Sequence, residues 1–253
     1  MRSLSQPLVA ATVGLFLLGS AAAAGAQQAV PPPARMYVQV VRLKPEMVNE
    51  WLELQKNQVI PAQKKAGVTA RLTMTTVVGN AFEYTLLTPF ASWAAMDGDA
   101  PLVRALGAAG AAELNAKLRR CVAVQSSYLT TRRDSLSIPA NDALVWRIQV
   151  RRAVPGKMQE YLAHFRADVL PAMQRAKAEG KIAGVAVAVR GAGAPAGEFT
   201  VTTMYNKFAD LEGPNPVVAV LGQEAATKLA ARTDELSTAG QIIVRRRVAD
   251  LSF

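Results

Sequence analysis

Cysteine and histidine are almost absent from this sequence, and their scarcity removes several classes of functional site. Cys121 is the only cysteine and His164 the only histidine among 253 residues. A single cysteine cannot form a disulfide within the chain, and it cannot by itself ligate zinc or an iron–sulfur cluster. We therefore predict no metal site and no cofactor. Serine catalysis is also unsupported, because Ser126 and Ser127 stand in no G-x-S-x-G setting.

Long apolar runs are also scarce, and the one clear example lies at the N-terminus. Arg2 precedes the apolar stretch Leu8–Leu18, which is too short to cross a bilayer, and residues 24–26 match an A-x-A cleavage pattern. This arrangement predicts a signal peptide over residues 1–26 and a periplasmic or secreted mature chain that begins near Gln27. It also predicts no stable membrane anchor after cleavage. An uncleaved anchor is the alternative interpretation.

Acidic residues are too few to balance the basic ones, which leaves a formal net charge of +10. The basic residues are scattered in short groups, such as Arg119-Arg120, Arg151-Arg152 and the triplet 245–247. A nucleic-acid-binding protein more often gathers its charge on one helix or tail with aromatic residues between. The pattern therefore favours a generally basic surface and predicts no nucleic-acid partner.

An internal repeat is the most informative feature of the sequence. The segment Met36–Ala66 returns 110 positions later as 146–176 without a gap. Residues identical in both copies are Gln39/Gln149, Val40/Val150, Arg42/Arg152, Pro45/Pro155, Glu50/Glu160, Leu52/Leu162, Val59/Val169, Pro61/Pro171, Ala62/Ala172 and Ala66/Ala176. A repeat of this length indicates two copies of one structural unit.

Each copy reads as β-α-β-β-α-β. An alternating segment comes first, and a helix follows that begins near Pro45 or Pro155, since proline is tolerated in the first helical turn. Later strands and helices are predicted over 68–78, 82–88, 111–120 and 122–131 in the first copy, and over 182–190, 199–206, 224–236 and 241–248 in the second. The predicted organisation is a Pro-rich lead-in (27–35), repeat 1 (36–137), a linker (138–142) and repeat 2 (143–253).

This order is the ferredoxin-like plan, in which both helices cover one face of a four-stranded antiparallel sheet. The uncovered face carries too many apolar side chains to remain in water, so it needs a partner. Two tandem copies supply one. We predict an α+β protein in which two ferredoxin-like units pack their antiparallel sheets face to face as an intrachain α/β barrel.

The repeats resemble a known superfamily, the dimeric α/β barrels. VQVVRLKPEMVNEWLELQKNQVIPAQKKAG in the first copy and RIQVRRAVPGKMQEYLAHFRADVLPAMQRA in the second resemble NIPSNAP or antibiotic-biosynthesis-monooxygenase-type domains. Relatives include cofactor-independent oxygenases, isomerases and haem-degrading enzymes. The Asn, His and Trp shared by the haem-degrading members cannot be placed in this sequence. The resemblance therefore implies a fold, and it carries no catalytic motif.

The two singular residues have plain interpretations. His164 lies on the helical arc of Lys157, Glu160 and Asp168, away from the apolar stripe, which predicts an exposed structural histidine. Cys121 stands between a helix and a strand and is interpreted as a small buried hydrophobic residue, with a reactive thiol as the alternative.

The candidate site is the inner face of the barrel. We assume that the fully apolar face of each first strand, Met36, Val38 and Val40 in the first copy, packs against the helices. The polar face of the same strand then points into the barrel. The residues then predicted to face the interior from the first strands are Tyr37, Gln39, Arg147, Gln149 and Arg151. Alternation in the other strands adds Arg71, Thr73, Thr75, Glu83, Thr85, Arg245 and Arg247.

From these we predict a ligand site formed by Gln39, Arg71, Arg147, Gln149 and Arg151, which suits an anionic or polyphenolic small molecule. The alternative is that the polar groups pair with one another, for example Arg71 with Glu83, and only satisfy the core.

Two functions follow. The first is a non-catalytic small-molecule-binding or structural domain, as a monomer or homodimer. The second is a cofactor-independent monooxygenase or isomerase acting on an acidic or polyphenolic aromatic, with Tyr37 or Glu83 as the proton-transfer group.

Overall fold

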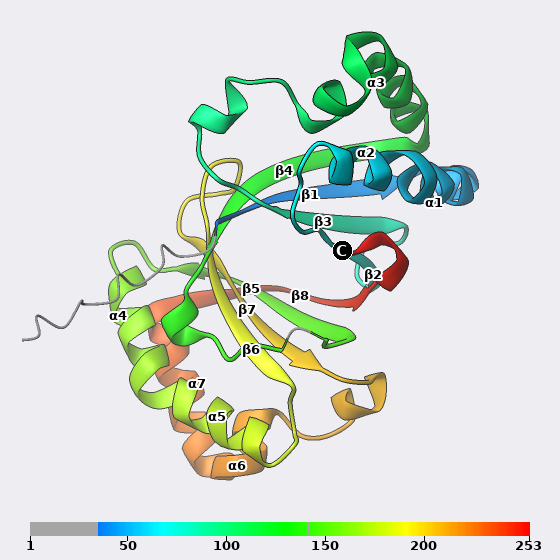
Figure 1. Cartoon of the computed structure of the whole chain (residues 1–253). Helices are drawn as coiled ribbons and strands as arrows, with labels where there is room; N and C mark the ends of the chain where they lie inside the picture. The colour runs from blue at the N-terminus through cyan, green and yellow to red at the C-terminus, as the bar shows by residue number, and fades with distance from the viewer. Residues whose placement is uncertain (1–34, 141) are drawn as a thin grey trace, which may run out of the picture. The chain divides into compact units, whose positions relative to one another are not determined.

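The computed structural model describes residues 35–140 and 142–253, which form one compact unit. The predicted signal peptide and residues 27–34 of the lead-in lie outside the described residues. Within them, both halves of the chain follow the predicted order of elements (Figure 1). The first half contains β1 (Arg35–Leu43), α1 (Val48–Leu54), α2 (Ile60–Lys65), β2 (Leu72–Val78), β3 (Glu83–Pro89), α3 (Pro101–Cys121) and β4 (Val122–Arg132). The second contains β5 (Val145–Ala153), α4 (Met158–His164), α5 (Leu170–Ala178), β6 (Gly184–Arg190), β7 (Glu198–Tyr205), α6 (Pro216–Leu221), α7 (Gln223–Leu236) and β8 (Ser237–Arg247).

The strands form a closed antiparallel barrel in the order β1-β3-β2-β8-β5-β7-β6-β4. Each half contributes a sheet with the ferredoxin-like order, β4-β1-β3-β2 and β8-β5-β7-β6. Hydrogen-bonded pairing of β2 with β8 and of β4 with β6 joins the two sheets at seams on opposite sides of the ring. The predicted α+β barrel of two ferredoxin-like units is therefore confirmed, and closure removes every open sheet edge.

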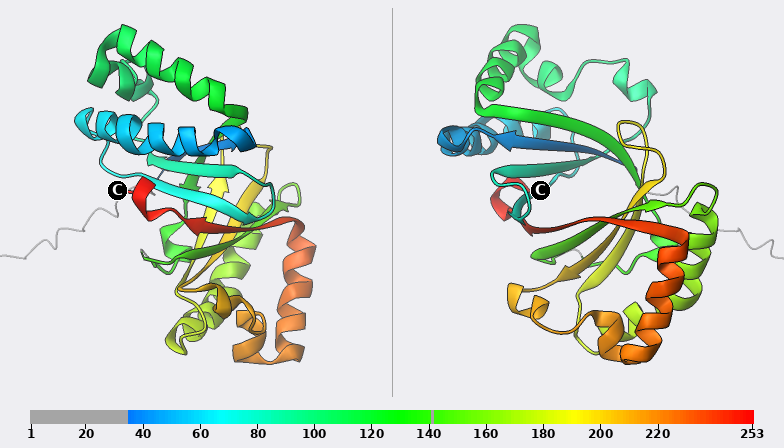
Figure 2. Two further views of the ribbon diagram at one scale, coloured as in Figure 1. Left: turned by 90° about the vertical axis from the view of Figure 1, so that its right-hand side faces the viewer. Right: turned by 180° about the vertical axis from the view of Figure 1, so that it is seen from behind.

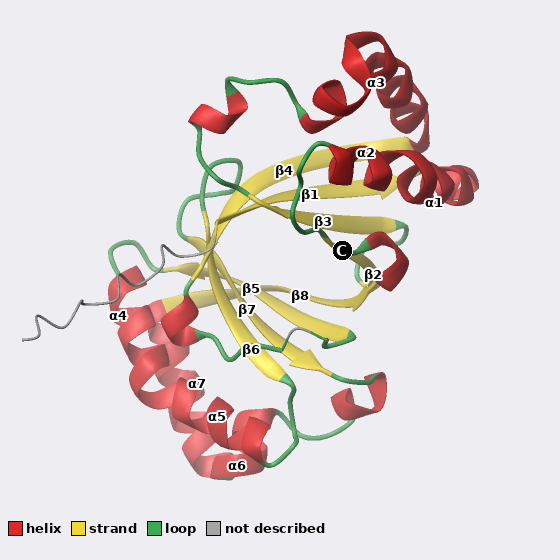
Figure 3. Cartoon of the chain, in the orientation of Figure 1, coloured by secondary structure: helices red, strands yellow, loops and turns green. Residues whose placement is uncertain are grey.

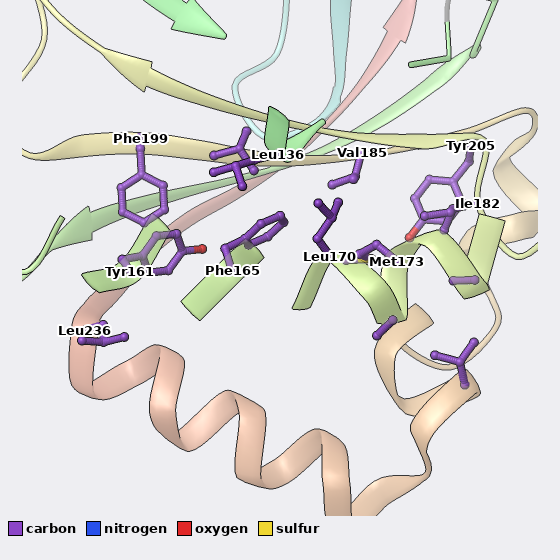
Figure 4. Packing of buried hydrophobic residues seen from close by; sticks show 14 of the residues in the cluster. Leu136, Tyr161, Phe165, Leu170, Met173, Ile182, Val185, Phe199, Tyr205 and Leu236 are labelled. Atoms are coloured by element: carbon purple, nitrogen blue, oxygen red, sulfur yellow. The ribbon is translucent and has the colours of Figure 1, made fainter. Parts of the chain in front are cut away.

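Helices cover the barrel on two sides, with α1–α3 over the sheet of the first half and α4–α7 over that of the second (Figures 2 and 3). Each layer encloses its own hydrophobic core between helices and sheet. In the first, Trp51 packs on Tyr84 with ring centroids 4.9 Å apart, beside the fully buried Cys121. In the second, Tyr161 packs on Phe199 at 4.4 Å (Figure 4). Burying each aromatic ring contributes about 1.5–3 kcal/mol.

The prolines late in the first helix of each repeat have a definite structural effect. A π-helical turn precedes each one, Gln55–Val59 before α2 and Phe165–Val169 before α5, and Pro61 and Pro171 are the second residues of α2 and α5. Proline has no N–H to donate to the carbonyl four residues earlier, and its ring crowds that carbonyl, so the helix widens locally.

One glycine in each repeat divides the second helical region, for which the sequence predicts a single helix. Gly222 (φ 79°) separates α6 from α7, and Gly107 (φ 72°) interrupts α3 at the matching place. A positive φ is readily adopted only by glycine, so both breaks depend on this residue type. Helix therefore begins earlier than predicted, at Pro101 and Pro216.

A serine fastens each seam of the barrel. After β4 the chain makes a short turn and Ser137 Oγ accepts the Val187 amide and donates to the Arg133 carbonyl. After β8, Ser252 Oγ likewise accepts the Thr73 amide and donates to the Val248 carbonyl. The Leu-Ser pairs that end both repeats thus make equivalent links between one half of the chain and the other.

Candidate functional site: the barrel interior

A cavity of about 650 Å³ occupies the barrel interior. All eight strands contribute to its wall, together with residues 137–140 and Phe253. Most lining side chains are apolar: Met36, Val38, Leu72, Met74, Leu87, Trp146, Ile148, Ala186, Ala188 and Met204. A volume of this size, with a wall that is mostly apolar and also carries polar groups, is typical of sites for small organic molecules.

Four arginines reach the cavity from the two seams of the barrel. Arg245 and Arg247 come from β8, and Arg132 and Arg190 come from β4 and β6 on the opposite side. Each has a carboxylate partner: Glu83, Asp142, Asp134 and Glu198 respectively. Each of these four cations is matched by an anion, so they add little net charge to the cavity. Arg71, which also borders the cavity, donates to uncharged side chains.

The Arg245–Glu83 pair is the most deeply buried of these ion pairs. Arg245 Nη2 lies 2.8 Å from Glu83 Oε1, and both side chains are at most 10% exposed. Glu83 also accepts hydrogen bonds from the Thr76 hydroxyl and the Asn80 amide, at 3.1 and 3.0 Å. With these bonds made, Glu83 holds the Arg245 guanidinium in a fixed position at the cavity wall.

The opposite wall carries an aromatic and cationic pair. The guanidinium carbon of Arg190 lies 4.6 Å from the centre of the Tyr128 ring, and Nη1 donates to Glu198 at 3.1 Å. A cation over an aromatic face is stabilising, more so away from water. Arg190 is thus held on two sides, and Tyr128 is the one tyrosine among the lining residues.

Thr85 is the single fully buried hydroxyl of the lining that makes no hydrogen bond within the described chain. The residue is 1% exposed, and its Oγ1 finds no partner among the described residues. Thr130, on β4, also lines the cavity, but its hydroxyl donates to the Val189 carbonyl at 3.2 Å. An unpartnered buried hydroxyl costs about 1–3 kcal/mol, so Thr85 is an unusual choice for a purely structural wall.

The predicted facing of the two first strands is wrong. Met36, Val38, Trp146 and Ile148 line the cavity, whereas their neighbours lie on the outer face. Four residues predicted to point inward, Tyr37, Gln39, Arg147 and Gln149, are half-buried there and are not part of the lining. Both faces of these strands are covered by protein, so a two-residue period gives the alternation without showing which face is interior.

Arg151 and Arg71 belong to the helix layers. Arg151, also predicted to point inward, donates to the Ser237 hydroxyl at 2.9 Å and to Asp234 at 2.6 Å on the outer side of the sheet. Arg71 borders the cavity, but its guanidinium donates to the side chains of Gln55, Gln63 and Thr73. Burial lowers the pKa of Arg71 to about 10.

The alternation predicted for β2 is inverted, because Leu72 and Met74 line the cavity and Thr73 and Thr75 do not. The alternation in β3 and β8 gave a better result. Thr85, Arg245 and Arg247 line the cavity as expected, and Glu83 lies behind Arg245. Glu83 pairs with Arg245 rather than with Arg71, the partner suggested by the sequence. The residues brought together are therefore Glu83, Thr85 and Arg245. Of the two suggested proton-transfer groups, Tyr37 is outside the cavity.

The residues that sequence reasoning missed come from β4 and β6: Tyr128, Thr130, Arg132 and Arg190. One signal was available, because Arg132 precedes Leu136-Ser137 by the same spacing as Arg247 precedes Leu251-Ser252. This spacing places the two arginines at equivalent positions in the repeats.

His164 is buried, contrary to the prediction of a surface residue. Its side chain is 5% exposed, Nδ1 lies 2.7 Å from Asp168 Oδ2, and Nε2 lies 3.1 Å from Thr233 Oγ1. The predicted position of His164 on the face away from the apolar stripe is correct, but α7 packs against α4 and covers that face. The Asp-His-Thr order is that of a catalytic triad, yet Thr233 donates to the Leu229 carbonyl of its own helix and does not line the cavity. We interpret the group as structural.

Cys121 is buried as predicted, with no exposed surface. Burial, with a smaller contribution from Glu50, raises the pKa of its thiol. A thiol with a raised pKa is a poor nucleophile, which supports the packing role. Within residues 35–140 and 142–253, no group of three or more His, Cys, Asp or Glu side chains is placed to hold a metal ion. In the same residues, no helix combines the length and apolar character needed to span a bilayer.

Comparison with known proteins gives matches at the level of structure only. No family model matches the sequence, and no curated protein matches it. A candidate monooxygenase of Lactobacillus acidophilus superposes with a TM-score of 0.56 over 87% of this chain and 95% of its own, at 11% identity. An anthrone oxidase-like protein superposes with a TM-score of 0.56 over 86% of this chain and 92% of its own, at 10% identity. A candidate monooxygenase of Fusobacterium nucleatum gives 0.53 over 86% and 94%, with 8% identity.

At these identities the likeness establishes the fold. The closed barrel and its likeness to these solved structures show that this chain has the dimeric α/β-barrel fold. Both ferredoxin-like units that build the barrel lie within one polypeptide, so one chain encloses the whole cavity.

Proposed function

We propose that the protein binds a small aromatic molecule, rich in oxygen acceptors, inside the barrel. The observation that carries this proposal is the 650 Å³ cavity with lining from all eight strands. A barrel with only a structural role would fill its interior with side chains, as small barrels do. Trp146, Tyr128 and three methionines offer flat and polarisable contacts to an aromatic body.

Polar groups of the wall support a ligand with oxygen atoms. The sequence suggested an anionic small molecule, and the arginines of the lining retain that possibility. Four of the five lining arginines are paired with carboxylates, and only Arg71 donates to uncharged side chains instead, so we propose that the ligand carries at most one negative charge. Acidic and phenolic aromatics of two or three rings satisfy both conditions.

Filling the cavity tests this proposal. Ala188 lines the cavity on β6, so Ala188→Phe should occupy part of its volume and weaken binding of naphthoic acid or a hydroxynaphthalene at least tenfold by calorimetry. Ala231→Phe, on the exposed side of α7, is the matched control and should bind as the wild type does. Equal affinity in both variants, or no binding by the wild type, would refute an interior site.

A second candidate is a cofactor-independent monooxygenase or isomerase acting in the same cavity. Its support is that fold neighbours are named as candidate monooxygenases or anthrone oxidase-like. Oxidation of an activated CH₂ by O₂ to C=O and H₂O balances with no further reductant. Tyr128 lines the cavity and is the phenol placed to exchange a proton with a bound molecule.

Oxygen uptake separates the two candidates. An oxygenase should consume O₂ with anthrone faster than the spontaneous reaction, and Tyr128→Phe should reduce that rate, whereas a binding protein should show neither effect. Tyr37→Phe is the control, since Tyr37 lies on the outer face of β1.

We also propose that the chain is exported after cleavage near Gln27, acts as a monomer or homodimer, and binds no nucleic acid. The support is the N-terminal pattern and the scattered charge. We further propose that residues 38–67 are related to NIPSNAP-type domains, as their resemblance in sequence suggests. Intact mass of exported material checks the cleavage, and retention of Met1 there would contradict it.

A further inference from the structure

We propose that Thr85 is the specificity-determining residue of the cavity, and that its hydroxyl, beside Arg245, binds one oxygen atom of a neutral planar aromatic ketone or alcohol. The inference rests on the proposed binding function and makes it specific. Its test is therefore designed so that failure of the anchor can be distinguished from failure of the site.

Apolar side chains flank Thr85 across the sheet and on one side along its strand. On the inner face of the sheet its cross-strand neighbours are Val40 of β1 and Met74 of β2, and Leu87 follows two residues later on the same strand. Valine would fill this place without a cost, because it has the same shape and no polar atom. A hydroxyl that is 1% exposed and without a partner in the described chain is instead available to a bound molecule.

Three other threonines near the interior have partners for this group. Thr130 Oγ1 donates to the Val189 carbonyl, and Thr73 Oγ1 donates to the Leu251 carbonyl at 2.7 Å on the outer side. Thr76 Oγ1 donates to Glu83. Only Thr85 among these is left without such a bond in the described residues.

Arg245 supplies a second donor one cross-strand row away on the same wall, because its partner on β2 is Thr76 whereas the partner of Thr85 is Met74. Glu83, two residues before Thr85, lies on the same face of β3 and holds Arg245 at 2.8 Å. The bonds of Arg245 to Glu83 and Thr76 use Nη2 and Nε, so Nη1 can donate to a ligand. Glu83 is thus a positioning residue, and Arg245 lines the cavity.

The chemistry of this corner selects the ligand class. A carbonyl or hydroxyl oxygen has two lone pairs and can accept from both the Thr85 hydroxyl and the Arg245 guanidinium. A full negative charge is disfavoured here, because Glu83 already neutralises Arg245 in a buried setting. The surrounding Val, Met and Leu side chains suit an unsubstituted aromatic surface.

A matched pair of ligands tests the anchor directly. Fluorenone and fluorene share one ring system and differ by a single carbonyl oxygen. We expect wild-type protein to bind fluorenone about 5- to 30-fold more tightly than fluorene, by calorimetry or by quenching of Trp146 fluorescence in a Trp51→Phe/Trp93→Phe background. Thr85→Val should reduce this ratio to near one by weakening fluorenone alone.

Two further variants complete the design. Thr85→Ser keeps the hydroxyl and should keep the preference for fluorenone. Thr203→Val removes a buried hydroxyl from β7 at a position outside the lining, and it should also bind as the wild type. Thr85→Val should melt at the same temperature as the wild type or higher, since it removes an unpaired buried hydroxyl, which also verifies folding.

Each outcome has a clear meaning. If Thr85→Val still prefers fluorenone, the role of Thr85 as anchor is wrong, and the proposed binding function stands. The same conclusion follows if the wild type binds both compounds equally well. If the wild type binds neither compound while it binds acidic naphthalenes, the neutral class is wrong. Failure to bind any of them overturns the binding function itself and the anchor with it.

Discussion

His164 shows how a single residue gains its role from a distant helix. Its ring contacts Asp168 on its own helical surface and Thr233, which is 69 positions away on α7. A polar side chain enclosed in this way contributes to stability through bonds that water cannot replace once they are buried.

We expect His164→Ala to lower the free energy of unfolding by about 1–3 kcal/mol, because it leaves a cavity where the buried ring was and removes the bonds of that ring to Asp168 and Thr233. Urea denaturation at pH 7 measures it. Lys157→Ala, which removes only an exposed ion pair with Glu160, should change stability by less than about 0.5 kcal/mol and serves as the control. A change that small in His164→Ala would restore the surface interpretation.

Tyr161 makes stability depend on alkaline pH. Burial raises the pKa of its phenol to about 12, from the usual 10, against an opposing effect of Arg151. The unfolded chain therefore ionises first as pH rises. The stability from the neutral buried phenol is fully present below about pH 10 and is lost between about pH 10 and 12, by roughly 2–3 kcal/mol.

Tyr161→Phe should remove most of this loss, because phenylalanine cannot ionise, while stability at pH 7 changes little. Denaturation midpoints of both proteins measured from pH 8 to 12 check the expectation. Parallel pH curves for the wild type and the variant would contradict it. Tyr205→Phe should act in the same direction, since burial raises the pKa of Tyr205 as well.

At the scale of elements, closure of the barrel depends on two short seams. The pairing of β4 with β6 extends over only three residue pairs, Thr130–Arg132 with Ala188–Arg190. The serine links of Ser137 and Ser252 stand at the ends of these seams and extend them by bonds between side chain and backbone. Short seams of this kind make a local hydrogen bond unusually important to closure.

Ser137→Ala and Ser252→Ala should each lower the free energy of unfolding by about 1–3 kcal/mol, because each leaves a strand amide without its acceptor. The two sites lie at opposite seams and share no partner, so the double variant should show the sum of the two effects within about 0.5 kcal/mol. Ser92→Ala, which removes an exposed turn bond, is the control. A strongly non-additive double variant would show that the seams are coupled.

For the molecule as a whole, shared seams should make the two halves unfold together. Each half has its own helix-covered core, but neither sheet has a free edge of its own, since both ends of each are paired with the other. Cooperative unfolding is the normal behaviour of one compact unit of this kind.

Phe165→Ala should lower the free energy of unfolding by about 3–5 kcal/mol through a cavity in the second core. Fluorescence of Trp51, in a background with phenylalanine at positions 93 and 146, reports on the first core. We expect its midpoint in urea to fall together with that of far-ultraviolet circular dichroism. A Trp51 midpoint that stays unchanged would show two independently unfolding units.

The repeat, the order of elements and the closed barrel were all contained in the sequence. Matching positions such as Gln39 and Gln149 exposed the repeat, and local signals such as Pro45 and Pro155 placed the elements, because these features act within a few residues of the chain. Alternation in β3 and β8 also gave the interior positions of Thr85 and Arg245.

Only the tertiary structure decided which faces became interior and which polar groups met. The first strands are covered on both sides, so Gln39, Arg147 and Gln149 lie outside although their alternation was clear. Partners distant in sequence, such as Glu83 with Arg245 and His164 with Thr233, depend on the packing of whole elements. A sequence fixes what each strand and helix is able to bury, whereas the faces that are buried against each other depend on how the barrel closes.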